Sequence, residues 1–228
     1  MSVIEIHRDL RPMFGATRDQ RGRPTCVAFA TSDAHAALRE GWEPLCCEYA
    51  FYHAQRRAGR LPTQGAVLPM MMESLAKDGQ PVEAVWPYLN ALPANLAAWR
   101  PPAQLGKLHG RAGALSSKAL DQIIATLDEG RPVILLLMLS PCFFEPGAGG
   151  IIEPAAGEVP EPARRHAVIA CGHGTINGQP ALLVRNSWGA RWGIGGCGWL
   201  TQTFLKPRLF AAATLLEDVD VSAHSIAA

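Results

Sequence analysis

The stretch Gln20-Arg21-Gly22-Arg23-Pro24-Thr25-Cys26-Val27-Ala28-Phe29-Ala30 holds the most informative local pattern of this chain. It places Cys26 directly after a loop that contains Gly and Pro, at the predicted start of a helix and six residues after Gln20. A thiol at a helix N-terminus lies near backbone N–H groups that lack intrahelical partners and near the positive end of the helix dipole. Both features favour the thiolate, which is the nucleophilic form of cysteine. The stretch therefore marks Cys26 as a candidate nucleophile.

Two partners for this thiol follow downstream, His166 in Arg165-His166-Ala167-Val168 and Asn186 in Asn186-Ser187-Trp188-Gly189. The residues between them read as two strands joined at Asn177-Gly178, a dipeptide that accepts positive φ and is typical of a tight hairpin. Such a hairpin returns His166 and Asn186 to the same end of the ribbon. Because Cys26 comes from the other half of the chain, we expect the three groups to meet where the two halves meet.

The two halves differ in their predicted secondary structure. Helical spacing of apolar residues, together with Gly and Pro at the ends, predicts helices over residues 26–40, 43–57, 66–78 and 117–129, with a loop-rich region over 81–116. Apolar runs predict strands over residues 133–139, 166–171, 181–185, 198–201 and 210–215. The chain is therefore expected to be α+β, with a helical lobe packed on a β-rich lobe and a cleft between them.

Composition narrows the class of protein. The chain has 228 residues with 48% hydrophobic residues, enough to build a sizeable core. Its 21 basic and 20 acidic residues nearly balance, which gives no electrostatic reason to expect binding to nucleic acid or to an anionic membrane. The longest strongly apolar run, residues 133–139, is too short to span a bilayer, which takes roughly 20 residues as a helix.

The N-terminus and the cysteines indicate a compartment. The first ten residues do not resemble a secretory signal, because no apolar core follows a basic stretch. The six cysteines are expected to be thiols, since a chain of this size needs no disulfide staples. We therefore expect a cytoplasmic protein, or one exported by a route that needs no signal peptide. Cys171-x-His173 offers only two ligands and is interpreted as structural, so no metal site is expected.

The three residues are suited to acyl transfer. A thiolate beside an imidazolium attacks a carbonyl without first losing a proton, and His166 can then protonate the departing amine. Asn186 can fix the tautomer and tilt of the ring through a hydrogen bond. The backbone N–H of Cys26 and the side-chain amide of Gln20 can stabilise the oxyanion of the tetrahedral intermediate. Trp188 can cover the hydrogen bond between His166 and Asn186.

Four blocks of this sequence resemble the papain family of cysteine proteases. They are Gln20, Cys26-Val27-Ala28-Phe29, His166-Ala167-Val168 and Asn186-Ser187-Trp188-Gly189. The separation of 140 residues between Cys26 and His166 falls within the roughly 130–150 residues typical of the family. Weaker similarity at Gly65-Ala66, Gly79 and Trp86-Pro87-Tyr88 extends the resemblance over residues 10–215.

The resemblance implies a single papain-like peptidase domain over residues 1–228. Its helical lobe would span about 20–115 and its β-rich lobe about 116–220, with residues 1–19 packing across. It also implies hydrolysis of peptide or amide bonds through a thioester, with a polypeptide substrate and no cofactor or metal. The implied catalytic residues are Cys26 as nucleophile, His166 as acid and base, Asn186 as orienting residue and Gln20 as oxyanion donor. The implied substrate-binding residues are Gly65, Ala66, Ala167 and Trp188.

The sequence departs from the family pattern at several positions. Arg23 stands where the family commonly has a cysteine held in a disulfide, and Val27 stands where the family usually has Trp. Arg165 precedes the histidine, and its charge is expected to disfavour protonation of the imidazole. Only 19 residues precede Gln20, so the long inhibitory N-terminal segment of the family is not expected. Regulation would then use another device, such as a proteinaceous inhibitor or an immunity-type partner.

Three alternatives stay open at this point. The same thioester serves acyl transfer to an amine or deamidation of a glutamine side chain, with the chain acting as a delivered effector. The second alternative is a binding domain that has the same fold but no catalytic activity. The third concerns the Pro-, Gly- and Glu-rich segment 145–165, which is either an ordinary solvated loop or a flap. The acidic residues of such a flap would favour basic substrates; they are Glu145, Glu153, Glu158 and Glu161.

Overall fold

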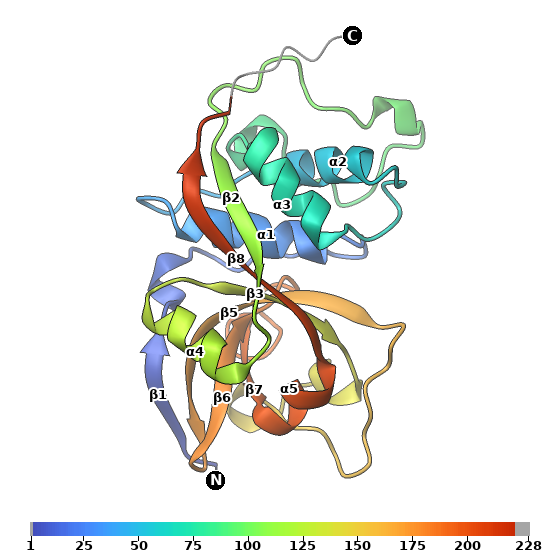
Figure 1. Ribbon diagram of the computed structural model, residues 1–228. Coiled ribbons are helices and arrows are strands. Elements are labelled where there is room, and N and C mark those ends of the chain that lie inside the picture. Colours follow the sequence, from blue (N-terminus) through green and yellow to red (C-terminus); the bar gives the residue numbers. More distant parts are fainter. Residues whose placement is uncertain (1, 222–228) are drawn as a thin grey trace. The chain divides into compact units, whose positions relative to one another are not determined.

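A computed structural model describes residues 2–221 of the chain, which form two compact units. The β-rich unit consists of residues 2–19 and Leu115–Thr214, and the helical unit consists of residues 20–114 and 215–221. Figure 1 labels the helices and most of the strands of both. The predicted α+β class is confirmed. One boundary differs from the prediction, because residues 215–220 belong to the helical unit and not to the β-rich one.

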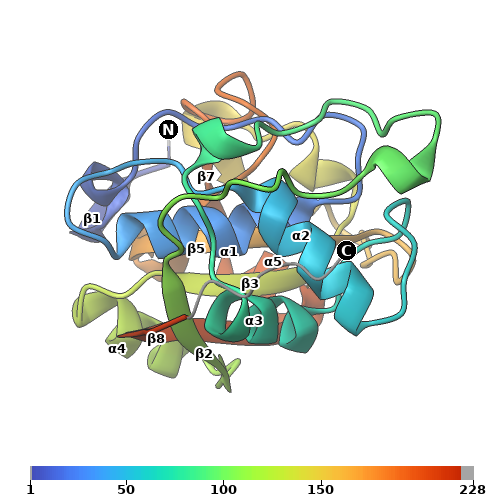
Figure 2. The same ribbon diagram turned by 90° about the horizontal axis from the view of Figure 1, so that it is seen from above.

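Three helices that pack against one another form the helical part of this unit (Figure 2). They are α1 (Cys26–Ala37), α2 (Cys47–Arg57) and α3 (Leu68–Lys77). From Val27 onward every residue of α1 is buried, so this helix has no solvent-exposed face. Strand β2 (Gly110–Ser116) and the end of β8 (Leu209–Val219) complete the unit, with short 3-10 turns at Glu83–Val85 and Leu96–Ala98.

The prediction that the second helix begins at Glu43 is wrong, since α2 begins at Cys47. The residues before it are extended and pair with a distant segment. The backbone N–H of Cys46 donates to the carbonyl of Pro81 over 2.9 Å, and that of Glu83 donates to the carbonyl of Pro44 over 2.8 Å. The sulfur of Cys46 then accepts from the backbone N–H of Tyr49 over 3.3 Å and caps the helix. Long-range backbone pairing thus overrides local helix propensity here.

The β-rich unit is built on a sheet whose central strands run antiparallel to their neighbours. Along the sheet, β8, β3, β5, β6, β7 and β4 follow one another, and β1 pairs with β5. Only β4 runs parallel to its partner, β7. The strands not yet bounded are β1 (Ile4–Asp9), β3 (Val133–Met138), β4 (Ile151–Ile152), β5 (Arg165–Ile176), β6 (Gln179–Arg185) and β7 (Cys197–Thr201).

Two helices pack on this sheet, α4 (Leu120–Asp128) on β5 and β3, and α5 (Gln202–Arg208) on β6 and β7 (Figure 1). The core between them is formed by buried aliphatic and aromatic side chains from the strands and both helices. Its members include Ile123, Leu127, Leu135, Leu137, Val168, Leu182, Val184 and Phe204. Among residues 2–221, no helix combines the length and apolarity that crossing a bilayer requires.

The predicted hairpin at Asn177-Gly178 is confirmed and sets the register of β5 against β6. Asn177 has φ +50° and Gly178 has φ +76°, the left-handed region that such a turn requires. Pairing runs from Ile176 opposite Gln179 to Ile169 opposite Arg185. His166 lies three residues before the last pair and Asn186 one residue after it, so the hairpin brings both to the same end of the sheet.

Candidate active site

His166 and Asn186 form a buried hydrogen-bonded pair at the end of the β5–β6 ribbon. The Nε2 atom of His166 lies 2.7 Å from Oδ1 of Asn186, and the two residues are 6% and 3% exposed. Since an amide oxygen only accepts, the ring must carry its proton on Nε2 and donate it to Asn186. The same oxygen accepts from the backbone N–H of Ser187 over 2.8 Å. Asn186 therefore selects the tautomer in which Nδ1 is the basic nitrogen of the ring.

Aromatic side chains surround this pair. The Trp188 ring packs on the His166 ring with centroids 4.6 Å apart, and Phe143 meets both rings edge-on. Phe144 stacks on Trp188 at 5.5 Å with an angle of 17° between the planes. The Nε1 of Trp192 donates to the carbonyl of Phe143 over 2.9 Å and so holds the 3-10 turn Pro141–Phe143, which Phe144 follows directly. The rings exclude water from the hydrogen bond and thereby strengthen it.

Burial dominates the electrostatics of His166. It lowers the pKa of the ring to about 4, while the hydrogen bond to Asn186 acts in the opposite direction. The expectation that Arg165 disfavours protonation is wrong in its cause. The Arg165 side chain donates to the carbonyl of Pro162 and lies over the Phe210 ring, because neighbouring residues of a strand point to opposite faces. An imidazolium at neutral pH therefore requires an anion beside the ring.

In the helical unit, Cys26 is the first residue of α1, with Thr25 as its N-cap, and its side chain is half-buried. The loop before it is held by its own hydrogen bonds. The side-chain Nε2 of Gln20 donates to the carbonyl of Arg23 over 2.8 Å, and the backbone N–H of Thr25 donates to the same carbonyl over 2.9 Å. One N–H of the Gln20 amide is thus used inside the loop, and a primary amide has a second.

Tyr88 contacts this loop, and the sequence analysis assigns it no catalytic or binding role. Its hydroxyl donates to the carbonyl of Gln20 over 2.7 Å and lies 2.9 Å from Oγ1 of Thr25. Its ring also packs edge-on against Phe29 of α1. In the sequence, the Trp86-Pro87-Tyr88 segment shows only a weak similarity to the family, so its part in holding the Gln20 loop emerges from the tertiary contacts alone.

The predicted substrate-binding residues divide between the two units. Gly65 lies against the loop before Cys26, since a Cβ built on it would come within 3.9 Å of the carbonyl oxygen of Pro24. Ala66 follows it and both are half-buried. Ala167, in the β-rich unit, is 1% exposed and lies opposite Leu136 of β3, so its methyl group belongs to the packed interior. A substrate contact of Ala167 stays a prediction.

Part of the acidic charge expected for a flap over residues 145–165 is used internally. The carboxylate of Glu158 accepts from the backbone N–H groups of Cys142 and Ala155, over 3.1 and 3.3 Å. Its carbonyl accepts from the buried Arg208 over 3.2 Å. Glu161 forms an ion pair with Arg164 at 2.7 Å. These two residues therefore anchor and neutralise the segment, which leaves Glu145 and Glu153 as the acidic side chains of the flap hypothesis.

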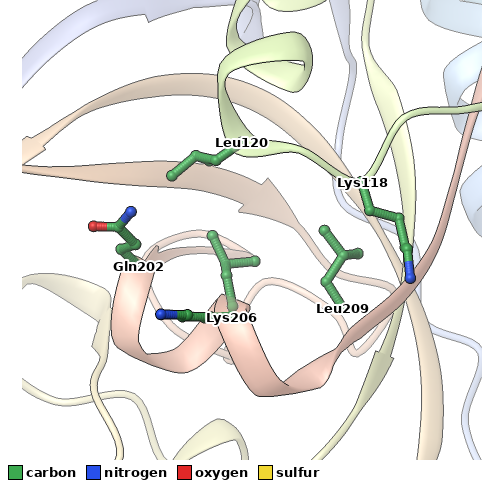
Figure 3. A pocket seen from close by; sticks show the side chains of 6 residues that line it. Lys118, Leu120, Gln202, Lys206 and Leu209 are labelled. Atoms are coloured by element: carbon green, nitrogen blue, oxygen red, sulfur yellow. The ribbon is translucent and has the colours of Figure 1, made fainter.

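Two further features lie outside the His166–Asn186 pair. A pocket of about 360 Å³ opens between the start of α4 and α5 (Figure 3). Its lining residues are Lys118, Leu120, Gln202, Leu205, Lys206 and Leu209. None of these is a predicted site residue. Over residues 2–221, no group of three or more His, Cys, Asp or Glu side chains is arranged to hold a metal ion. All six cysteines fall within this range and are thiols.

Trp188 is the predicted part of the aromatic cover of His166, whereas the two phenylalanines were not predicted. Phe143 and Phe144 follow β3 and lie more than 20 residues before His166, in a short 3-10 turn without a recognisable motif. Two adjacent phenylalanines at a strand end are a weak signal that fits any core. The contact with the ring depends on how the turn folds back over the end of β5.

Comparisons with known proteins agree with this geometry. The family model described as "Papain family cysteine protease" matches residues 87–203. A cysteine protease of Blomia tropicalis is 31% identical over 82 residues, which cover 36% of this chain and 24% of that protein. Caricain of Carica papaya is 26% identical over 179 residues, which cover 77% of this chain and 49% of caricain. The aligned segments thus cover less than half of these relatives.

A solved structure supports the fold over most of the chain. Xylellain, a cysteine protease from Xylella fastidiosa, superposes with a TM-score of 0.78 at 18% identity, covering 93% of this chain and 86% of xylellain. Bromelain from Ananas comosus, solved with the inhibitor E64, gives a TM-score of 0.68 at 18% identity. The fold expected from the sequence motifs is therefore confirmed.

Proposed function

Because the chain belongs to the papain family of cysteine proteases, we propose that it is a cysteine peptidase that hydrolyses peptide or amide bonds through a thioester on Cys26. The observation that carries the proposal is the 2.7 Å hydrogen bond between His166 and Asn186 beneath Trp188. A buried histidine oriented by a neutral amide, in a family whose members use cysteine chemistry, is suited to exchange a proton with a thiol.

The first half of the proposed reaction forms the thioester. The Cys26 thiolate attacks the carbonyl carbon of the substrate, so that a carbon–sulfur bond forms and the carbonyl oxygen becomes an oxyanion. The His166 imidazolium then gives its Nδ1 proton to the leaving nitrogen as the carbon–nitrogen bond breaks. Burial lowers the pKa of His166 to about 4, so in this proposal the thiolate is the anion that keeps the ring protonated before attack.

The second half returns the enzyme to its starting state. Neutral His166 takes a proton from a water molecule, whose oxygen attacks the thioester carbon. The carbon–sulfur bond breaks, the thiolate leaves, and the carboxylic acid is released. Throughout, Asn186 accepts from Nε2, so that Nδ1 is the ring nitrogen left to exchange protons. Asparagine carries no charge, so it orients the ring without the basicity that a carboxylate partner would add.

The oxyanion is assigned to the Gln20 side chain and the backbone N–H of Cys26. A donor of this kind is worth on the order of 3 kcal/mol in the reaction barrier. The Gln20 amide is held by its hydrogen bond to the carbonyl of Arg23, and the loop is closed by Tyr88. A preorganised donor loses little energy in reorientation as charge develops, which supports this role for the loop.

Labelling with an epoxide inhibitor such as E-64 tests the proposal directly. Intact-mass measurement at pH 6.5 is expected to show one adduct on the wild type and none on Cys26→Ala. Cys142→Ala is the matched control, because Cys142 is also half-buried and burial raises the pKa of its thiol to about 11. That variant should label like the wild type. An unlabelled wild type, or an adduct that survives in Cys26→Ala, would rule out Cys26 as the activated thiol.

Substrates and products separate peptidase activity from the other reactions of a thioester. Incubation with a denatured protein should yield new N-termini, detected by mass spectrometry, without release of ammonia. Ammonia release without cleavage would indicate deamidation, and a mass gain on an added amine would indicate acyl transfer. A polypeptide substrate is part of this proposal. Two further expectations stay predictions: regulation by an inhibitor protein, and a location in the cytoplasm or outside the cell after export without a signal peptide.

A further inference from the structure

A buried ion pair lies directly beside the loop that carries Gln20 and Cys26. The two guanidinium nitrogens of Arg23 donate to the two carboxylate oxygens of Glu48, over 2.6 and 2.9 Å. Arg23 is 7% exposed and Glu48 is 1% exposed. This fork-to-fork geometry is the strongest form of a charge-assisted hydrogen bond, and lysine cannot reproduce it. Both residues belong to the helical unit.

The pair connects three segments of that unit. Besides holding Glu48 on α2, Arg23 donates to the carbonyl of Leu89 over 2.7 Å. Glu48 in turn accepts from the backbone N–H of Leu89 over 3.1 Å and from Nε1 of Trp99 over 2.6 Å. The guanidinium also lies over the rings of Phe51 and Tyr88. The loop before Cys26, helix α2 and residues 88–99 are therefore joined at one buried point.

Backbone contacts carry this anchoring to the predicted oxyanion donor. The carbonyl of Arg23 accepts from the side-chain Nε2 of Gln20 and from the backbone N–H of Thr25. The backbone N–H of Arg23 donates to the carbonyl of Gln20 over 3.4 Å. A shift of Arg23 would thus move the atom on which the Gln20 amide rests and the residue that precedes Cys26.

We propose that Arg23 and Glu48 are positioning residues of the proposed reaction, which hold the Gln20 amide and the first turn of α1 in the geometry that the oxyanion requires. The inference rests on the proposed function and adds residues outside the four named for catalysis. A charge pair buried in this way adds little net stability compared with apolar side chains of similar volume, whereas loss of one partner is strongly destabilising. Its value at this place is the fixed geometry of the loop.

The double variant Arg23→Met/Glu48→Met separates positioning from simple stabilisation. Arg23→Met leaves the Glu48 carboxylate buried without its counter-ion, so both the melting temperature and kcat should fall, kcat by about 100-fold. The double variant removes both charges, so its melting temperature should rise above that of Arg23→Met, and it should stay below that of the wild type because the N–H of Leu89 and Nε1 of Trp99 lose their acceptor. A positioning role predicts that kcat stays low in the double variant, with KM within threefold of the wild type.

Two single variants serve as references. Arg57→Met breaks the 2.7 Å ion pair between Arg57 and Asp78, which belongs to the same unit but does not contact the Gln20 loop. This variant should leave kcat unchanged. Arg23→Lys keeps the charge without the fork and should fold even where Arg23→Met does not, with kcat lowered about tenfold. Amide hydrogen exchange over residues 20–26 should become faster in the Arg23 variants and not in Arg57→Met.

The outcomes distinguish this inference from the proposed function. Suppose that the wild type is labelled at Cys26 and cleaves peptides. A folded double variant whose kcat rises together with its melting temperature then overturns the positioning role. So does a folded Arg23→Lys with wild-type kcat and unchanged hydrogen exchange. A wild type that is neither labelled nor active overturns the proposed function instead. Persistently low kcat in a stable double variant, with faster exchange over residues 20–26, supports the inference.

Discussion

Replacing Asn186 by alanine removes the acceptor on which the orientation of His166 depends. The variant deletes an oxygen that accepts from Nε2 of His166 at 2.7 Å and from the backbone N–H of Ser187 at 2.8 Å. Because His166 and Asn186 are 6% and 3% exposed, water cannot easily replace that oxygen. A buried donor left without a partner costs about 1–3 kcal/mol. The protein should remain folded, since native domains are typically stable by about 5–15 kcal/mol.

The same energy sets the expected loss of activity. If the proton prefers Nδ1 once the Nε2 acceptor is gone, about 1–3 kcal/mol is needed to restore the reactive tautomer, which lowers kcat/KM by roughly 5- to 150-fold. The assay is hydrolysis of a fluorogenic peptide amide under kcat/KM conditions, with nitrogen-15 chemical shifts of the His166 ring reporting the tautomer. Asn95→Ala is the control, because Asn95 Oδ1 only caps an exposed 3-10 turn through Ala97. A folded Asn186→Ala variant with kcat/KM within twofold of the wild type would refute the orienting role.

Three further predictions concern stability, the flap segment and substrate entry. Burial lowers the pKa of His35 to about 4 from 6.5, so between these pH values the folded state binds fewer protons than the unfolded state, and the free energy of unfolding should fall by roughly 2 kcal/mol at pH 5. Urea titrations at pH 7 and pH 5 should show this loss. A His35→Gln variant with the same loss would contradict the assignment to His35. Glu158→Ala removes the acceptor for the backbone N–H groups of Cys142 and Ala155, so an added protease should cut within residues 153–164 faster than in the wild type. The Glu153→Ala variant should be cut at the wild-type rate. Gly65→Leu places a side chain next to the carbonyl of Pro24 at a glycine without positive φ, so the fold should persist while KM for peptides rises several-fold, and an unchanged KM would remove Gly65 from the substrate-binding surface.

Much of the candidate site could be predicted because its signals are local. Cys26, His166 and Asn186 each stand in a short block whose residue types serve the same chemistry, and the Asn177-Gly178 turn alone brings two of them together. The strands missed by sequence reasoning have weak local signals. Strand β1 is mostly exposed and β2, Gly110–Ser116, is rich in small residues, so both exist because another strand pairs with them.

The proposed reacting groups, the α+β class and the β5–β6 hairpin are predicted from the sequence by itself, because they depend on residue chemistry and on turn preferences over a few neighbouring positions. Tertiary structure alone decided that Arg23 pairs with Glu48, that Phe143 and Phe144 cover Trp188 and His166, and that α2 begins four residues late. These features join residues far apart in the chain, and a buried charge or ring has no preferred partner until the surrounding backbone has closed around it.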